Sequence, residues 1–112
     1  MASAVIAYVT ASSREEALAI GRAIVKERLA ACANVLDGMT SVYHWQGAIE
    51  ESGEAVLILK TRPDLAEPLI ERVKELHSYD CPCVIVWPIT AGNPAYLQWI
   101  ATEAGPGPDV VV

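Results

Sequence analysis

The sequence has few basic residues and no cluster of them. Its 112 residues include 8 lysines and arginines against 14 aspartates and glutamates, so the formal net charge is −6 at pH 7. Nucleic acids and anionic membranes carry dense negative charge and repel such a surface on average. We therefore expect neither a nucleic-acid partner nor a membrane partner.

The sequence also lacks a long apolar run, a signal-like start and an even set of cysteines. No apolar run approaches the roughly 18 residues that a membrane helix needs. Residues 1–6 carry no basic segment ahead of their apolar residues, as a signal peptide would. The three cysteines, Cys32, Cys81 and Cys83, do not fit a closed disulfide framework. These absences predict a cytoplasmic protein with reduced thiols.

What the sequence does have is an excess of apolar residues for its size. They make up 53% of the chain, and the mean hydropathy is +0.30. A chain of this length forms one core, and a small domain leaves much of its surface exposed. We therefore expect a single domain over residues 1–112, with residues 105–112 as a tail, and we expect part of the apolar surface to lie between subunits.

The first half of the chain reads as a strand, a helix and a long hairpin. Residues 4–10 form a short apolar run typical of a central strand. Ser13 and Glu16 have the spacing of a capping box, and apolar residues then recur with helical spacing, which predicts a helix over residues 14–30.

The hairpin has two possible forms around Asp37-Gly38, which can be either a turn or a bulge. The apolar pattern resumes at once through Trp45, so we prefer one long strand with a kink at Gly38. Polar residues 46–53 then read as the hairpin end, and residues 54–61 as the second arm.

The second half predicts a helix, an edge strand and a short final helix. Pro63 opens the helix, with Asp64 as its candidate N-cap. Residues 84–87 form the last strand, and Pro88 indicates a sheet edge because proline cannot donate to a ladder. Asn93 caps a helix that runs to about residue 104.

The resulting order, β-α-β-β-α-β plus a short C-terminal helix, is the plan of an α+β ferredoxin-like sandwich with an antiparallel sheet. Both crossover helices then cover one face of the sheet, and the other face is bare. A neighbouring subunit would cover that face.

Five stretches carry a resemblance to a known family. They are residues 28–35 (RLAACANV), 40–47 (TSVYHWQG), 59–61 (LKT), 77–82 (HSYDCP) and 92–99 (GNPAYLQW). Together, in this order and over nearly the whole chain, they resemble the CutA family of divalent-cation tolerance proteins. The resemblance implies a homotrimer of ferredoxin-like subunits, similar in architecture to the PII signalling proteins. It also implies a role in tolerance of copper and other divalent metals, and no enzymatic activity.

The chain departs from the family at its metal-binding positions. Family copper sites are placed on a cysteine at the end of the first strand and on a histidine near the end of the second helix. Here the first position is Val9, which cannot bind a metal, and only His77 matches. Ser78 and Cys83 also replace the family's usual proline and glutamate.

His77, Cys81 and Cys83 form this chain's own candidate metal site. Thiolates and imidazole suit copper(I) or another soft or divalent metal ion, and cysteines two apart on a strand share a face. Three ligands are one short of a closed tetrahedral site, and a trimer could supply more. The alternative is that the cysteines pack as small hydrophobic side chains. We expect no cofactor to be required for folding.

A second function class is a thiol-dependent enzyme using Cys32 or the Cys81/Cys83 pair. Small alanines surround Cys32, which favours tight core packing. A catalytic cysteine also needs a base, and the sequence nominates none.

The aromatic residues and one lysine form a candidate ligand cleft or subunit interface. Tryptophan and tyrosine are enriched at protein interfaces, so packing and ligand binding are both open. Lys60, at a strand end, could meet an anion there. The residues concerned are Tyr43, His44, Trp45, Lys60, Trp87, Tyr96 and Trp99.

Overall fold

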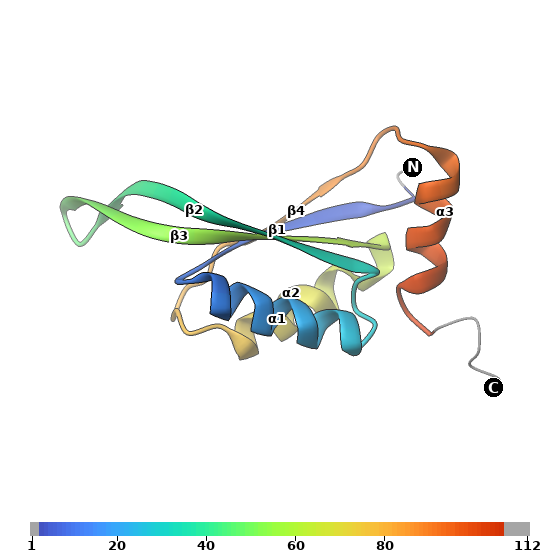
Figure 1. Cartoon of the computed structure of the whole chain (residues 1–112), viewed down its shortest axis with the longest axis horizontal. Helices are drawn as coiled ribbons and strands as arrows, with labels where there is room; N and C mark the ends of the chain where they lie inside the picture. The colour runs from blue at the N-terminus through green and yellow to red at the C-terminus, as the bar shows by residue number, and fades with distance from the viewer. Residues whose placement is uncertain (1–2, 107–112) are drawn as a thin grey trace.

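The computed structural model describes residues 3–106 as a four-stranded antiparallel sheet with two helices on one face and a third at its end (Figure 1). The strand order is β2-β3-β1-β4. This confirms the predicted ferredoxin-like arrangement. The predicted tail from residue 107 onward lies outside the described residues. The elements are β1 (Val5–Ala11), α1 (Arg14–Lys26), β2 (Cys32–Trp45), β3 (Ala48–Thr61), the 3-10 turn η1 (Pro63–Leu65), α2 (Ala66–Leu76), β4 (Val84–Pro88) and α3 (Pro94–Glu103).

The core lies between the sheet and the helices α1 and α2. Alternate residues of β1 are buried, as a strand with one face on the core requires. Gly21 brings α1 close to the sheet: a Cβ built on it would lie 3.1 Å from Leu57 and 3.1 Å from Ala33. The largest fully buried side chains of this core are Val9, Ile20, Ile24, Leu57, Leu59, Leu69 and Val73.

The long second strand and its kink are confirmed. β2 runs unbroken from Cys32 to Trp45, and its pairing with β3 shifts register between Leu36 and Met39. Gly38 sits in that bulge with φ +79°, a conformation that glycine adopts without steric cost.

The hairpin end is shorter than the sequence predicted. Gln46 and Gly47 alone form the turn, both with positive φ, and Trp45 pairs with Ala48. Two-residue turns of this kind match the twist of the flanking strands. The expectation that β3 begins at Glu54 was therefore wrong, because residues 48–53 form the solvent-exposed part of a projecting strand.

Two helix boundaries also differ from expectation. α1 ends at Lys26 rather than at residue 30, because Arg28 takes a left-handed conformation with φ 62°. Asp64 does not cap a helix. It pairs with Arg62 at 2.6 Å, and α2 begins only at Ala66 after the 3-10 turn.

The β2–β3 hairpin projects beyond the helices as an arm (Figure 1). It makes the chain elongated, 51 × 28 × 22 Å with a radius of gyration of 15.0 Å, where a compact chain of this length gives about 13 Å. β4 lies at the sheet edge, as predicted. Among residues 3–106, no helix is long and apolar enough to cross a membrane.

Much large apolar surface remains exposed on the arm, the bare sheet face and α3. Val42 and Ile49 of the arm are 63% and 69% exposed. The other exposed large apolar residues are Leu36, Tyr43, Trp45, Ile85, Trp87, Tyr96 and Trp99. This is the unpartnered surface that the apolar excess of the sequence predicted.

Candidate functional site

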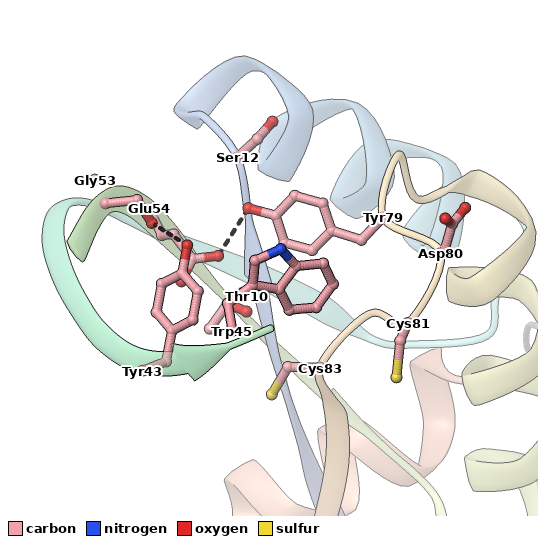
Figure 2. Close-up of a pocket in the computed structure, with 11 residues that line it drawn as sticks. Thr10, Ser12, Tyr43, Trp45, Gly53, Glu54, Tyr79, Asp80, Cys81 and Cys83 are labelled. Carbon is pink, nitrogen blue, oxygen red and sulfur yellow. Dashed lines mark hydrogen bonds between the residues drawn. The ribbon is translucent and has the colours of Figure 1, made fainter. Parts of the chain in front are cut away.

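A cavity of about 600 Å³ lies between the hairpin arm and the loop that joins α2 to β4 (Figure 2). The end of β1, with Thr10 and Ser12, closes a third side. The side chains that matter most for its chemistry are Tyr43 and Trp45 from β2, Glu54 from β3, and Tyr79, Cys81 and Cys83 from the loop.

The loop is held to the domain by His77. The imidazole is buried, its Nε2 lies 2.7 Å from the carbonyl oxygen of Thr10, and its Nδ1 accepts the backbone N–H of Tyr79 at 3.1 Å. Because Nδ1 accepts, the proton is on Nε2, which donates to Thr10. Both nitrogens are therefore engaged within the chain.

This arrangement separates His77 from the predicted metal site. A histidine ligand needs one nitrogen with a free lone pair, and neither is free here. Within residues 3–106 there is no group of three or more His, Cys, Asp or Glu side chains placed to hold a metal ion. The structure thus does not bring His77, Cys81 and Cys83 together as a three-ligand site in one chain, and His77 positions the loop instead.

Glu16 fastens the same loop to the start of α1. The backbone N–H of Glu16 donates to the Ser13 hydroxyl oxygen at 3.1 Å, which confirms the Ser13 side-chain cap of the predicted capping box. Its carboxylate accepts the N–H and hydroxyl of Ser12 at 2.9 and 2.8 Å and, through the other oxygen, the N–H of Ser78 at 2.9 Å. Burial alone would raise the pKa of Glu16, but the hydrogen bonds from Ser78 and Ser12 together outweigh it and lower the pKa to about 2.

Tyr79 joins the loop to the arm. Its hydroxyl donates to Oε2 of Glu54 at 2.8 Å, a contact drawn in Figure 2. Burial, and then the hydrogen bond to the Glu54 carboxylate, raise the pKa of Tyr79 to about 12. The phenol is therefore neutral at physiological pH, and it fixes one wall of the cavity against another.

Cys81 and Cys83 both line this cavity as free thiols. Cys81 is exposed and Cys83 is half-buried. Asp80 immediately precedes Cys81 in sequence, and in Figure 2 its carboxylate points away from the sulfur of Cys81. These two cysteines are what remains of the predicted metal site, and Glu54 lines the same cavity.

The remaining predicted residues divide between two places. Tyr43 and Trp45 line the cavity, whereas His44 alternates to the other side of the arm. At the opposite end of the sheet, Lys60 Nζ lies 3.2 Å from the hydroxyl of Tyr96, whose ring stacks on Trp99 at 5.6 Å.

Cys32 and Trp87 lie on the bare sheet face. Cys32 is half-buried, and its sulfur is 3.7 Å from the Tyr96 hydroxyl, so the expectation of a core cysteine was wrong. The alanine packed into the core is Ala30, which is 1% exposed. Trp87 packs against Tyr8 with ring centroids 5.9 Å apart.

Sequence reasoning missed Tyr79, Glu54 and the β1 end as parts of the site. Tyr79 had a usable signal, since it lies in the same short stretch as His77 and Cys81. Glu54 had no usable signal, because the sequence of an exposed hairpin arm does not indicate which loop a polar residue in it contacts.

Comparison with known proteins places these features in a family. The family model described as "CutA1 divalent ion tolerance protein" matches residues 5–103. The chloroplastic protein CutA of Arabidopsis thaliana is 46% identical over 86% of this chain, and the divalent-cation tolerance protein CutA of Thermus thermophilus is 43% identical over 89%. The chain spans 53% of the length of the first relative and 97% of the second. The crystal structure of CutA1 from Oryza sativa superposes with a TM-score of 0.89 at 39% identity, over 93% of this chain and 95% of that one.

Proposed function

Since the chain belongs to the CutA1 divalent ion tolerance family, we propose that it is a non-enzymatic cytoplasmic homotrimer that binds soft metal ions, copper(I) foremost, at sites near its subunit interfaces. The observation that carries the metal proposal is the placement of two free thiols, Cys81 and Cys83, on one cavity. The family description, a divalent ion tolerance protein, supports metal ions as the class of ligand, and the choice of a soft ion rests on the thiols.

The assembly proposal is supported by the exposed apolar surface. On the sheet face opposite the helices, Leu36 is 58% exposed, Ile85 53% and Trp87 43%. Monomeric proteins rarely expose contiguous apolar patches larger than a few hundred Å². The arm, which projects beyond the core of its own chain, gains packing partners if it lies against a neighbour.

The choice of metal follows from the donor atoms. Thiolates favour copper(I), whereas magnesium and calcium prefer all-oxygen sites. Within the described residues, one chain does not bring three metal ligands together. The two thiols must therefore bind an ion that accepts two ligands, or a further donor must complete the site. A neighbouring subunit at the bare face could supply that donor, which is why we place the sites near the interfaces.

A thiol-dependent enzyme has weaker support. Among residues 3–106, the Cys32 sulfur has hydrogen-bond contacts with Asn34 Oδ1 at 3.9 Å and with the Tyr96 hydroxyl at 3.7 Å. An asparagine amide cannot act as a general base, and the tyrosine hydroxyl is shared with Lys60.

The test is a copper(I) titration of the purified protein against a competing chelator. Wild type is compared with the Cys81→Ser/Cys83→Ser double variant and with Cys32→Ser as the matched single-thiol control. We expect the double variant to lose at least tenfold in affinity and the control to keep it. Affinity should also fall as the pH is lowered, since thiolate ligands must lose their protons to bind.

Equal affinity in the wild type and the double variant would place the metal elsewhere. A loss confined to Cys32→Ser would move the site to the bare sheet face. Absence of copper(I) binding in all three proteins would refute the metal proposal.

A further inference from the structure

Three aromatic residues, Tyr43, Trp45 and Tyr79, line the cavity. Tyr43 is 40% exposed and Trp45 57%, while Tyr79 is half-buried. Within the part of the chain that the structure describes, the Tyr79 ring pairs only with His77, at a tilt of 47°, and no ring pair involves Tyr43 or Trp45. Figure 2 shows the three side chains around the same space, from two walls of the cavity. Rings spaced in this way leave their faces available to a ligand.

The charged residues that line the cavity favour a positively charged ligand. Its lining residues include the acidic Glu54 and Asp80 and the hydroxyl-bearing Thr10, Ser12 and Ser52, and they include no lysine, arginine or histidine. An anionic ligand would meet repulsion there, and a cation would meet attraction. The whole chain, at a net charge of −6, favours the same sign.

The walls are held in place before any ligand arrives. The Tyr79 ring is backed by the His77 imidazole at a centroid distance of 4.6 Å, and its hydroxyl is fixed by Glu54. The Tyr43 hydroxyl lies 3.2 Å from the hydroxyl of Ser52. Rigid walls reduce the ordering that binding would otherwise require.

We propose that this cavity binds a small organic cation of the alkylammonium class, with a quaternary or methylated ammonium head against the rings of Tyr43, Trp45 and Tyr79 and its charge facing Glu54. Aromatic faces attract such heads because the ring quadrupole is negative at its face, and tryptophan is the strongest of the three ring types. A quaternary head has no N–H groups that need acceptors, so aromatic faces and one carboxylate satisfy it. A volume of about 600 Å³ lies within the usual range for small-ligand pockets.

This inference goes beyond the metal proposal and uses different side chains. The copper site depends on the thiols of Cys81 and Cys83, whereas the cation depends on the rings and on Glu54. Either proposal can therefore fail while the other holds.

The test compares choline with its neutral carbon isostere, 3,3-dimethylbutan-1-ol. Both are titrated into the assembled, metal-free protein, with the indole N–H resonances of the three tryptophans followed by NMR. We expect choline to bind at least tenfold more tightly than the alcohol and to shift the Trp45 resonance. Equal affinity for the two compounds would show that the cavity recognises apolar shape and not charge, and it would overturn the proposal. Absence of choline binding at millimolar concentration would overturn it as well.

Two variants locate the site, and one serves as control. Trp45→Leu removes the most exposed ring, and Glu54→Gln removes the charge while keeping the shape. Each should weaken choline binding at least fivefold, whereas Trp99→Leu on α3, outside the cavity, should leave it unchanged. If Trp45→Leu disturbs assembly, Glu54→Gln decides alone. Unchanged choline affinity in Glu54→Gln, or an equal loss in Trp99→Leu, would refute the assignment.

Discussion

Neutralising Glu16 is the sharpest perturbation of the loop that carries the site. This carboxylate accepts hydrogen bonds from Ser12 at the end of β1 and from Ser78 in the loop. Glu16→Gln preserves the shape, but its amide nitrogen cannot accept the N–H that the second carboxylate oxygen accepted. The variant should therefore be less stable at neutral pH, and the loop should be less firmly held.

The size of the effect follows from the pKa of Glu16. The pKa is about 2 in the folded protein against 4.5 for an unperturbed glutamate, and the side chain is 15% exposed. Since each pKa unit corresponds to 1.36 kcal/mol, the charged form gains at most about 3.4 kcal/mol in the folded state. Because glutamine keeps part of the hydrogen bonding, we expect the free energy of unfolding to fall by about 2–3 kcal/mol at pH 7.

The pH dependence has a definite sign. A pKa that is lowered by folding contributes stability that is fully present above the unfolded value of 4.5 and is lost as the pH falls towards 2. Urea unfolding at fixed protein concentration, between pH 7 and pH 2.5, should show the difference between wild type and Glu16→Gln shrinking over this range.

The matched control is Glu15→Gln, which removes an exposed carboxylate from the same helical turn. It should change stability at pH 7 by less than about 0.5 kcal/mol. If the two variants are equally stable, or if the Glu16→Gln difference is independent of pH, the hydrogen-bonded carboxylate does not hold the loop as described.

Two further outcomes follow from the fold. Trp87→Ala, on the bare sheet face, should weaken assembly by about 2 kcal/mol. Sedimentation equilibrium should then give a roughly 30-fold higher dissociation constant. An unchanged dissociation constant would show that this face is not the interface. Gly38→Ala should lower the free energy of unfolding in urea by about 1–2 kcal/mol, because φ at this position is +79°. No atom within 4 Å obstructs the added methyl group, so the cost comes from the backbone alone. An unchanged free energy of unfolding would mean that the bulge relaxes.

Local sequence signals predicted those parts of the fold whose stabilising contacts are also local. The cap at Ser13 and the cap at Asn93 were both recognisable because the capping side chain lies within three residues of the N–H that it binds. The bulge at Gly38 was recognisable because the apolar pattern continued on both sides of it.

The features that sequence reasoning missed depend on distant contacts. α1 ends early where Arg28 turns left-handed, and the Arg28 side chain donates to the carbonyl oxygens of Glu103 and Gly105, some 75 residues away. Asp64 faces Arg62, which also donates to the carbonyl oxygen of Ala104. The Arg62–Asp64 pair is local, but the distant partners of the two arginines could not be identified from the residues next to them.

The candidate site shows the same division. The stretch around His77 and Cys81 was recognisable as a unit, but the role of His77 depends on the carbonyl oxygen of Thr10, 67 residues earlier. That single contact turns an expected metal ligand into a support for the loop. The prediction that Cys81 and Cys83 act as a pair does not depend on it.

Native mass spectrometry of the copper(I)-loaded protein tests the central claim most directly, because it reports assembly and metal content together. With a chain mass of 12.0 kDa, we predict a species of about 36 kDa that carries copper. The Cys81→Ser/Cys83→Ser variant should have the same assembly and no bound copper. A monomer, or a trimer whose copper content is unchanged by the double substitution, would contradict the account.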